Sequence, residues 1–361
     1  VEHLDWGWDD EHAAAFAAVA EAGQAPGRRV TVTAGDHVGA MPPGQRRAVV
    51  GPRLKQTTTD PAALPAVGEW VVVDTTDPDQ PRVDAVLPRR SAFVRHAPGL
   101  RTEAQVLATN VDSVFIVMAL TRDFNLGRLE RYLGAAWSSG AQPVVVLNKT
   151  DLCEDLEAAL GQVASVAIGA PVHATSATEG TGLDGLGPYL EAGRTVALLG
   201  SSGVGKSTLV NALLGEERQL VRATRADDER GRHTTTSREL IRLPGGAILL
   251  DTPGMRSLAL WDDEGVQQAF ADIEALALTC RFSDCRHAAE PGCAVRRAIA
   301  AGDLSERRLE CQRKLEREMA SLTRRTGGVT ARAEQRAWGK MAKRMSGEAE
   351  RRRSPWGWDE A

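Results

Sequence analysis

Residues 200–207 carry the pattern Gly-x-x-x-x-Gly-Lys-Ser, which is typical of a phosphate-binding loop. Glycines let backbone N–H groups turn inward around phosphate oxygens, and a following helix adds the positive end of its dipole. Lys206 would reach the β- and γ-phosphates, and the Ser207 hydroxyl would bind Mg²⁺. A chance glycine-rich turn is disfavoured, because an apolar run precedes the motif and a helical pattern follows it. The expected nucleotide contacts are Gly200, Ser201, Ser202, Gly203, Val204, Gly205, Lys206, Ser207 and Thr208.

A second motif would recognise the nucleotide base. It is Asn148-Lys149-Thr150-Asp151, which follows the apolar run 144–147. The carboxylate of Asp151 can accept hydrogen bonds from N1–H and the 2-amino group of guanine, and adenine offers neither donor. Lys149 would lie along the base, and Asn148 would tie this loop to the phosphate loop. Four such residues occur by accident in many turns, but their position at a strand end favours the guanine interpretation.

Three shorter segments would complete the nucleotide site. A Ser-Ala pair one strand after the base motif would contact guanine O6 through its backbone. An Asp-Thr-Pro-Gly sequence at the end of an apolar strand would hold Mg²⁺ through water and sense the γ-phosphate. A threonine in the loop 230–236 would bind Mg²⁺ directly in the triphosphate state. The residues concerned are Ser176, Ala177, Asp251, Gly254 and Thr235, with Thr234 as an alternative to Thr235.

Hydrolysis requires a group that orients the attacking water, and Ras-like proteins use a glutamine just after the Asp-x-x-Gly motif. This chain has Met255 there, and a thioether cannot orient water. His233, in the threonine-rich loop, is the internal candidate for the catalytic residue. The alternative is that a partner completes the site and that His233 contacts the partner or nothing.

Three of the five cysteines lie with a histidine in a stretch of fourteen residues. Structural zinc accepts tetrahedral ligation by three cysteines and one histidine. The spacing differs from the common Cys-x₂-Cys pattern, and a redox-active thiol cluster is the alternative. We expect one structural zinc ion and no metal role for Cys153 or Cys311; the zinc ligands would be Cys280, Cys285, His287 and Cys293.

Composition and charge indicate a protein of several domains with a polyanionic partner. The chain has 361 residues, of which 42% are hydrophobic and 25% charged. It lacks a secretory signal and any apolar run near the roughly 20 residues of a membrane span, so we expect a cytoplasmic protein without membrane contact. Residues 304–353 hold fifteen Lys or Arg against seven Asp or Glu, although the net charge of the chain is −4. This basic tail favours a polyanionic partner, and a solvated helical tail would have the same composition.

The elements that must position these motifs change along the chain. An N-terminal extension (1–26) with a short alanine-rich helix precedes closely spaced β-rich runs in 27–95, which predict a small barrel of the oligonucleotide-binding (OB) or SH3-like type. Residues 96–262 alternate strands and helices, which predicts a parallel-rich α/β domain. Residues 263–322 are helical around the cysteine cluster, and the basic tail 323–361 follows.

The motifs stand in a rotated order, because the base-specifying motif precedes the phosphate loop. Ordinary small GTPases begin with the phosphate loop, so the same site would here be built from a circularly permuted chain. The segment after Asp251 then leads directly into the cysteine-containing region. Nucleotide state would therefore be able to move that region.

This motif order, the 232–236 loop, the sequence Asp251–Met255 and the cysteine–histidine knuckle together resemble the bacterial ribosome-small-subunit-dependent GTPase family, over residues 27–322. The resemblance implies an OB barrel, a circularly permuted GTPase domain and a C-terminal zinc domain. It also implies binding to the small ribosomal subunit and its rRNA during late maturation, with hydrolysis stimulated by the subunit. A hydrophobic residue in place of the catalytic glutamine is a family trait, with which Met255 agrees.

We therefore expect a monomeric GTP hydrolase that forms GDP and phosphate, uses Mg²⁺, and assists maturation of the small ribosomal subunit. The first alternative is a GTP-regulated RNA-binding scaffold with incidental turnover, to which Met255 gives some support. The second is an ATPase of the phosphate-loop type, which Asp151 disfavours. The basic tail would add RNA contacts outside the region of resemblance.

Overall fold

The computed structural model describes residues 4–33, 36–40, 45–58, 61–96, 104–122, 124–215, 238–251 and 263–325. The chain forms two compact units, Val1–Arg313 and Lys314–Ala361, and the description below concerns the first. Among the residues so described, no helix combines the length and the apolar character needed to cross a bilayer. Several residues singled out by the sequence lie outside the described ranges, namely His233, Thr234, Thr235, Gly254, Met255 and the tail from 326 onward.

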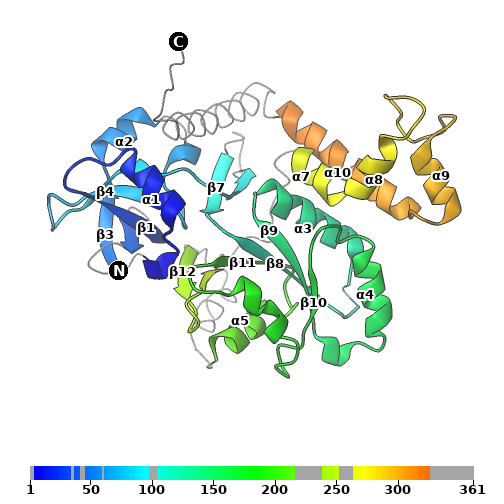
Figure 1. The fold of residues 1–361 in the computed structure, drawn as a ribbon, viewed down its shortest axis with the longest axis horizontal. Helices are drawn as coiled ribbons and strands as arrows, with labels where there is room; N and C mark the ends of the chain where they lie inside the picture. The colour runs from blue at the N-terminus through cyan, green and yellow to red at the C-terminus, as the bar shows by residue number, and fades with distance from the viewer. Residues whose placement is uncertain are drawn as a thin grey trace, which may run out of the picture. The chain divides into compact units, whose positions relative to one another are not determined.

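A five-stranded barrel occupies the first part of the chain (Figure 1). Strand β1 pairs with both β2 and β4, β3 runs parallel to β5, and β5 returns to β4. The closed order β1-β2-β3-β5-β4 is that of the OB fold, which decides between the two barrel types that the sequence left open. The strands are β1 (Gln24–Thr33), β2 (Asp36–Ala40), β3 (Gln45–Val50), β4 (Trp70–Asp74) and β5 (Arg82–Val86), with α2 (Pro52–Thr57) and the 3₁₀ turn η2 (Pro61–Ala63) between β3 and β4.

The sequence Trp-Gly-Trp-Asp at 6–9 contacts both the barrel and the loop before the sheet strand that begins at Thr195. It lies between the turn η1 (Leu4–Trp6) and helix α1 (Asp10–Ala17). Gly7 has a φ of +83°, and a Cβ at this position would lie 2.3 Å from the carbonyl oxygen of Gly193. Trp8 packs edge-on against Trp70 of the barrel, with ring centroids 4.7 Å apart. The same four residues recur at 356–359, beyond the described ranges.

His12 of α1 is buried beside Trp8 and Trp70, with 4% of its surface exposed. Its Nδ1 lies 2.8 Å from Oδ1 of Asp9, which also caps the helix by accepting a hydrogen bond from the His12 N–H. Its Nε2 has no hydrogen-bond partner. Burial, followed by the nearby Arg90 guanidinium, lowers the pKa of His12 in spite of Asp9.

Acidification is therefore expected to loosen the N-terminal segment. A histidine whose pKa is depressed by folding stabilises the protein above its unfolded pKa of about 6.5, and this contribution is lost as the pH falls below that value. Between neutral pH and about pH 5, the melting temperature should fall more in the wild type than in His12→Asn, which keeps a donor for Asp9 but does not titrate. Equal losses in the two proteins would contradict this role of His12.

The second part of the chain is an α/β sheet with the strand order β10-β9-β8-β11-β13-β12. All neighbours are parallel except β12, which runs antiparallel to β13 and also pairs with barrel strand β1. Every residue of β8 is buried, as expected for a parallel strand covered on both faces. The strands are β8 (Ser113–Ala119), β9 (Gln142–Asn148), β10 (Val172–Ala174), β11 (Thr195–Leu199), β12 (Arg238–Arg242) and β13 (Ile248–Asp251).

Helices on this sheet match the alternation that the sequence predicts. They are α3 (Leu126–Ser138), α4 (Leu156–Ala164) and α5 (Lys206–Leu214), with the 3₁₀ turns η3 (Thr150–Leu152) and η4 (Asp184–Tyr189). A separate hairpin, β6 (Ala92–His96) with β7 (Ala104–Thr109), links the barrel to the sheet. The helices after the sheet are α7 (Asp263–Ala269), α8 (Ala271–Ala277), α9 (Ala294–Ala301) and α10 (Glu306–Arg325).

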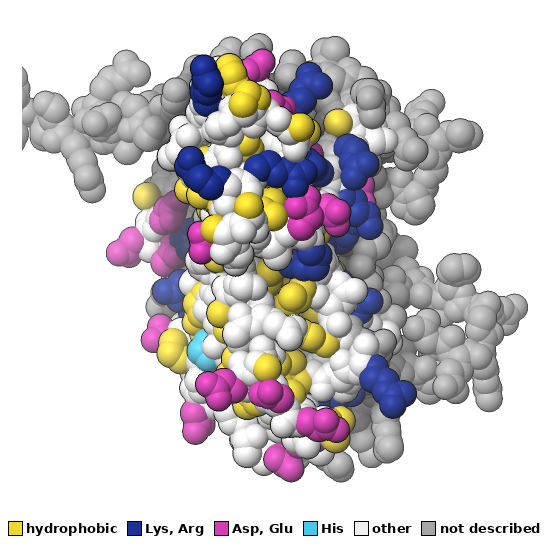
Figure 2. Space-filling view, turned by 90° about the vertical axis from the view of Figure 1, so that its right-hand side faces the viewer, with side chains coloured by type: hydrophobic (Ala, Val, Ile, Leu, Met, Phe, Trp, Pro, Cys, Tyr) yellow, Lys and Arg dark blue, Asp and Glu magenta, His cyan; other side chains and the backbone are white. Residues whose placement is uncertain are grey.

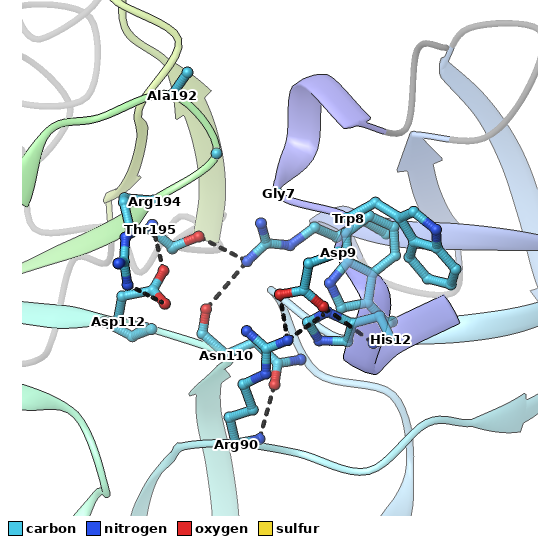
Figure 3. Close-up of a pocket in the computed structure, with 14 residues that line it drawn as sticks. Gly7, Trp8, Asp9, His12, Arg90, Asn110, Asp112, Ala192, Arg194 and Thr195 are labelled. Atoms are coloured by element: carbon cyan, nitrogen blue, oxygen red, sulfur yellow. Dashed lines mark hydrogen bonds and ion pairs between the residues drawn. The ribbon is translucent and has the colours of Figure 1, made fainter. Parts of the chain in front are cut away.

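A polar cavity of about 300 Å³ lies where the N-terminal segment, the barrel and the sheet meet (Figure 3). Arg28 crosses it, and its Nη2 donates to the Asn110 carbonyl at 3.1 Å and to the Thr195 hydroxyl at 2.8 Å. Complete burial lowers the pKa of Arg28 to about 10, and Asp112 opposes that shift. Asp112 precedes β8 and Thr195 begins β11, so the cavity lies at the amino ends of these strands. The phosphate-loop motif follows the other end of β11, and the cavity is therefore separate from it.

Candidate nucleotide and metal sites

Parallel strands bring the predicted nucleotide motifs to one edge of the sheet. Asn148 ends β9, Gly200 follows β11, and Asp251 ends β13. These strands and β10 share one direction, so their carboxyl ends face the same side. Ligands of open α/β sheets bind at this edge.

The loop 200–205 has the backbone conformation that only glycine adopts easily. Gly200, Gly203 and Gly205 have φ angles of 155°, 80° and 96°. A Cβ on Gly200 would lie 2.4 Å from the carbonyl oxygen of Val117, and one on Gly205 would lie 2.2 Å from Nδ2 of Asn148. The loop therefore has no space for side chains at its first and last glycines, which explains the sequence pattern in steric terms.

Lys206 and Ser207 stand at the beginning of α5, directly after this loop. The Lys206 ammonium donates to the carbonyl oxygens of Gly200 and Ser201 at 2.7 and 2.6 Å. The positive charge thus lies inside the turn, and the amino end of α5 adds partial positive charge. The arrangement fits an anionic ligand such as a phosphate group.

Asn148 joins three of the motifs through its buried amide. Its Nδ2 donates to the carbonyl oxygen of Val204 at 3.0 Å, and its Oδ1 accepts from the Ala177 N–H at 3.0 Å. The Thr175 hydroxyl lies 3.4 Å from the same Oδ1. The base motif, the Ser-Ala segment and the phosphate loop are therefore held in one hydrogen-bonded frame.

Asp151 lies in η3, two residues after Lys149, which adopts the left-handed conformation with a φ of 64°. The hydroxyl of Ser176, a fully buried residue, donates to Oδ1 of Asp151 at 2.6 Å. This bond fixes the orientation of a carboxylate that is otherwise exposed to solvent. The N–H of Thr150 donates to the carbonyl oxygen of Thr175, which holds the two loops together.

Sequence reasoning missed two contacts to the phosphate loop. Nη1 of Arg128, in the first turn of α3, donates to the Ser201 hydroxyl at 2.8 Å. The Tyr132 hydroxyl, one turn later, lies 3.4 Å from the same oxygen. No short motif marks either residue, because they lie far from the loop in the sequence and meet it only through the β8–β11 pairing.

The four predicted zinc ligands come together in the structure. Their ligand atoms all lie within 4.8 Å of one another. Sγ of Cys280 lies 3.9 Å from Sγ of Cys293 and 3.7 Å from Nδ1 of His287, and Cys293 Sγ is 3.5 Å from that nitrogen. Zinc bond lengths of about 2.3 Å to sulfur and about 2.0 Å to nitrogen, at tetrahedral angles, place such atoms about 3.5–3.8 Å apart. The donor set and its dimensions therefore fit a structural zinc ion.

Local backbone features hold this metal cluster in shape. His287 has a φ of 57°, a conformation that non-glycine residues adopt rarely. Cys293 is the N-cap of α9, and its sulfur accepts a hydrogen bond from the Arg296 N–H at 3.4 Å. The Glu290 carboxylate accepts from the backbone N–H groups of the loop that carries His287.

Comparison with known proteins places this chain among GTPases. Residues 86–261 match the family described as RsgA GTPase. A small ribosomal subunit biogenesis GTPase RsgA from Streptomyces avermitilis is 46% identical over 358 residues, covering 98% of this chain and 95% of that protein. Another from Opitutus terrae is 48% identical, with 93% and 94% covered. The chain belongs to the RsgA GTPase family.

Solved structures agree with this placement. YjeQ from Thermotoga maritima superposes with a TM-score of 0.61 at 25% identity, covering 82% of this chain and 99% of that one. YloQ, described as a circularly permuted GTPase, gives a TM-score of 0.61 at 23% identity and shows the same fold. The circularly permuted GTPase fold that the motif order predicts is thereby confirmed. As an RsgA GTPase the protein is a GTP hydrolase that uses GTP, GDP and Mg²⁺.

Proposed function

We propose that this GTPase assists late maturation of the small ribosomal subunit, that it binds the subunit and its rRNA, and that the subunit stimulates hydrolysis. The observation that carries the proposal is similarity along almost the whole chain to proteins named for biogenesis of this subunit. The share of the chain that these matches cover, 93% and 98%, exceeds what the GTPase domain alone would account for. The proposed place of action is the cytoplasm, as a monomer.

The surface chemistry of the first unit supports an RNA partner. Residues 280–313 include seven arginines, of which only Arg308 is buried, against five acidic residues, whereas residues 150–190 include six acidic residues and no Lys or Arg. Figure 2 shows most of the Lys and Arg side chains of this face in its upper half, with acidic side chains among them, and mainly acidic side chains along its lower edge. Positive charge beside a metal cluster, together with an OB barrel, suits contact with a phosphate backbone.

Within this function each candidate residue has a proposed role. Asp151 would read the guanine base, Lys206 the phosphates, and Ser207 with Thr235 the Mg²⁺ ion. His233 is proposed as the catalytic residue, with the subunit supplying what Met255 lacks. The proposed domain limits are 1–26, 27–95, 96–262, 263–322 and 323–361. The remaining nucleotide contacts are proposed to be Asn148, Lys149, Thr150, Ser176, Ala177, Gly200 to Gly205, Thr208, Asp251 and Gly254.

Subunit-stimulated turnover separates this proposal from a GTP-regulated RNA-binding scaffold, to which Met255 gives some support. Purified small subunits are expected to raise GTP turnover by about tenfold or more, because a partner that completes a GTPase site has effects of this size or larger. Large subunits serve as the control partner, and Lys206→Ala identifies turnover that belongs to this enzyme. Unchanged turnover in a complex that holds both GTP and the subunit would favour the scaffold.

A further inference from the structure

Helix α3 contacts the phosphate loop with one face. Arg128 and Tyr132 are four residues apart, so they project from the same side of the helix. Both reach the Ser201 hydroxyl, Arg128 with a hydrogen bond of 2.8 Å and Tyr132 at 3.4 Å. Asn125 caps the helix just before this face by accepting from the Arg128 N–H, so the position of Arg128 is fixed in the backbone as well.

The opposite face of α3 carries Glu130, which is fully buried. Its carboxylate accepts two hydrogen bonds from Arg307, at 2.8 and 3.1 Å, and one from Arg308 at 3.0 Å. Both arginines belong to the first turns of α10, which follow the metal cluster in the chain. Burial and the Glu130 carboxylate raise the pKa of the neighbouring Cys311 to about 12. Its thiol therefore stays neutral beside the ion pair of Glu130 with Arg307.

Arg308 extends this ion cluster to the helices that follow the GTPase sheet. Its Nε and Nη2 donate to the Asp272 carboxylate of α8 at 2.7 and 2.6 Å, and Nη2 also donates to the Ala269 carbonyl at 2.9 Å. One buried arginine, Arg308, and one partly exposed arginine, Arg307, thus face two carboxylates, one of them on α3. A buried cluster that is matched in charge holds its members strongly, because the loss of one leaves another unpaired.

Helix α7 lies against α3 as well. A Cβ on Gly265 would lie 2.0 Å from the Ser138 hydroxyl oxygen and 2.5 Å from the Gly134 carbonyl oxygen, so α7 has no room to move closer. This helix begins twelve residues after Asp251, the end of β13. The phosphate loop, helix α7 and helix α10 therefore all contact α3.

We infer that α3 couples the nucleotide site to the metal-binding region, with Arg128 as the residue that positions the phosphate loop and Glu130 as the anchor at the other end. A shift of the phosphate loop on nucleotide binding moves Arg128 through Ser201. The helix transmits that movement to Arg307 and Arg308, because Glu130 is bonded to both. Coupling of this kind is reciprocal, so a change at the anchor alters nucleotide affinity.

The first test measures hydrogen exchange of residues 306–313 with and without saturating GDP. Bound nucleotide is expected to slow exchange there in the wild type and to have no such effect in Arg128→Ala at equal saturation. Arg53→Ala is the matched control, because it removes a guanidinium from an ion pair on the barrel helix α2 whose side chains are 70% and 66% exposed. The inference is overturned if GDP slows exchange in residues 306–313 equally in the wild type and in Arg128→Ala, or if GDP does not slow it in the wild type.

The second test measures GDP affinity with a fluorescent analogue. Arg128→Ala and Ser201→Ala should each weaken binding by about tenfold, and the double variant should be no weaker than either, because both remove the same bond. Arg128→Lys should recover most of the affinity. Glu130→Gln, which touches no part of the phosphate loop, should weaken binding by about fivefold.

A folding defect is excluded by comparing melting curves and by a second anchor variant, Asp272→Asn. The Asp272 side chain is 27% exposed, so its loss is tolerated better than that of Glu130. It should weaken GDP binding in the same direction and by a smaller factor. Folded anchor variants with wild-type affinity overturn the coupling, and additive effects of Arg128→Ala and Ser201→Ala overturn the positioning role of Arg128.

Discussion

Replacing Asp151 with asparagine is expected to weaken GTP binding by about a hundredfold or more and to create a preference for xanthosine triphosphate. A carboxylate accepts from both N1–H and the 2-amino group of guanine, and each hydrogen bond to a charged group contributes about 1.5–3 kcal/mol. An amide presents one donor and one acceptor, which match the 2-oxo group and N1–H of xanthine. Equilibrium binding of fluorescent GTP and XTP analogues to the wild type and the variant measures both effects.

The contact between Asp151 and Ser176 supplies the control for this experiment. Ser176 donates to Oδ1 of Asp151 at 2.6 Å, so Ser176→Ala removes the bond that orients the carboxylate but keeps its charge. This variant should lose affinity only a few-fold and should keep its preference for GTP. If Asp151→Asn still prefers GTP, or if Ser176→Ala also accepts XTP, the assignment of base recognition to the carboxylate is wrong.

The sequence predicts those parts of the nucleotide site that depend on backbone geometry. The glycines of the phosphate loop are needed because a Cβ on Gly205 would collide with the Asn148 amide. The same constraint makes the pattern recognisable without coordinates. The apolar run expected before the phosphate loop is strand β11, because a buried parallel strand consists largely of consecutive apolar residues.

Contacts between distant segments could not be predicted in the same way. Arg128 meets Ser201, and Glu130 meets Arg307 and Arg308, only after the sheet has placed α3 beside both. Nothing in the local sequence distinguishes these charges from those of a solvated helix face. The choice between an OB and an SH3-like barrel likewise depends on which strands pair, and the β1–β4 pairing settles it.

Removing one zinc ligand is the second change from which we expect a large effect. In Cys293→Ser the side chain can still cap α9, since serine is a good N-cap residue, but the thiolate ligand is lost. Structural zinc contributes about 10 kcal/mol or more to the folding of small domains, so the loop 280–293 should unfold locally. Zinc content should fall from one ion per chain to almost none, as measured by elemental analysis, and amide exchange in α9 should rise.

Cys153→Ser is the matched control, because this cysteine lies outside the cluster, and it should keep its zinc. The outcome also decides between zinc and the redox alternative, because the two thiols of Cys280 and Cys293 are only 3.9 Å apart. A zinc-free wild type that forms a disulfide between them on mild oxidation would favour redox chemistry. A wild type that holds one zinc ion and resists oxidation until the metal is chelated would establish the cluster as structural. Helix α9, which Cys293 caps, leads from this cluster to α10, and α10 bonds to Glu130, so loss of the metal should also weaken nucleotide binding if α3 couples the two sites.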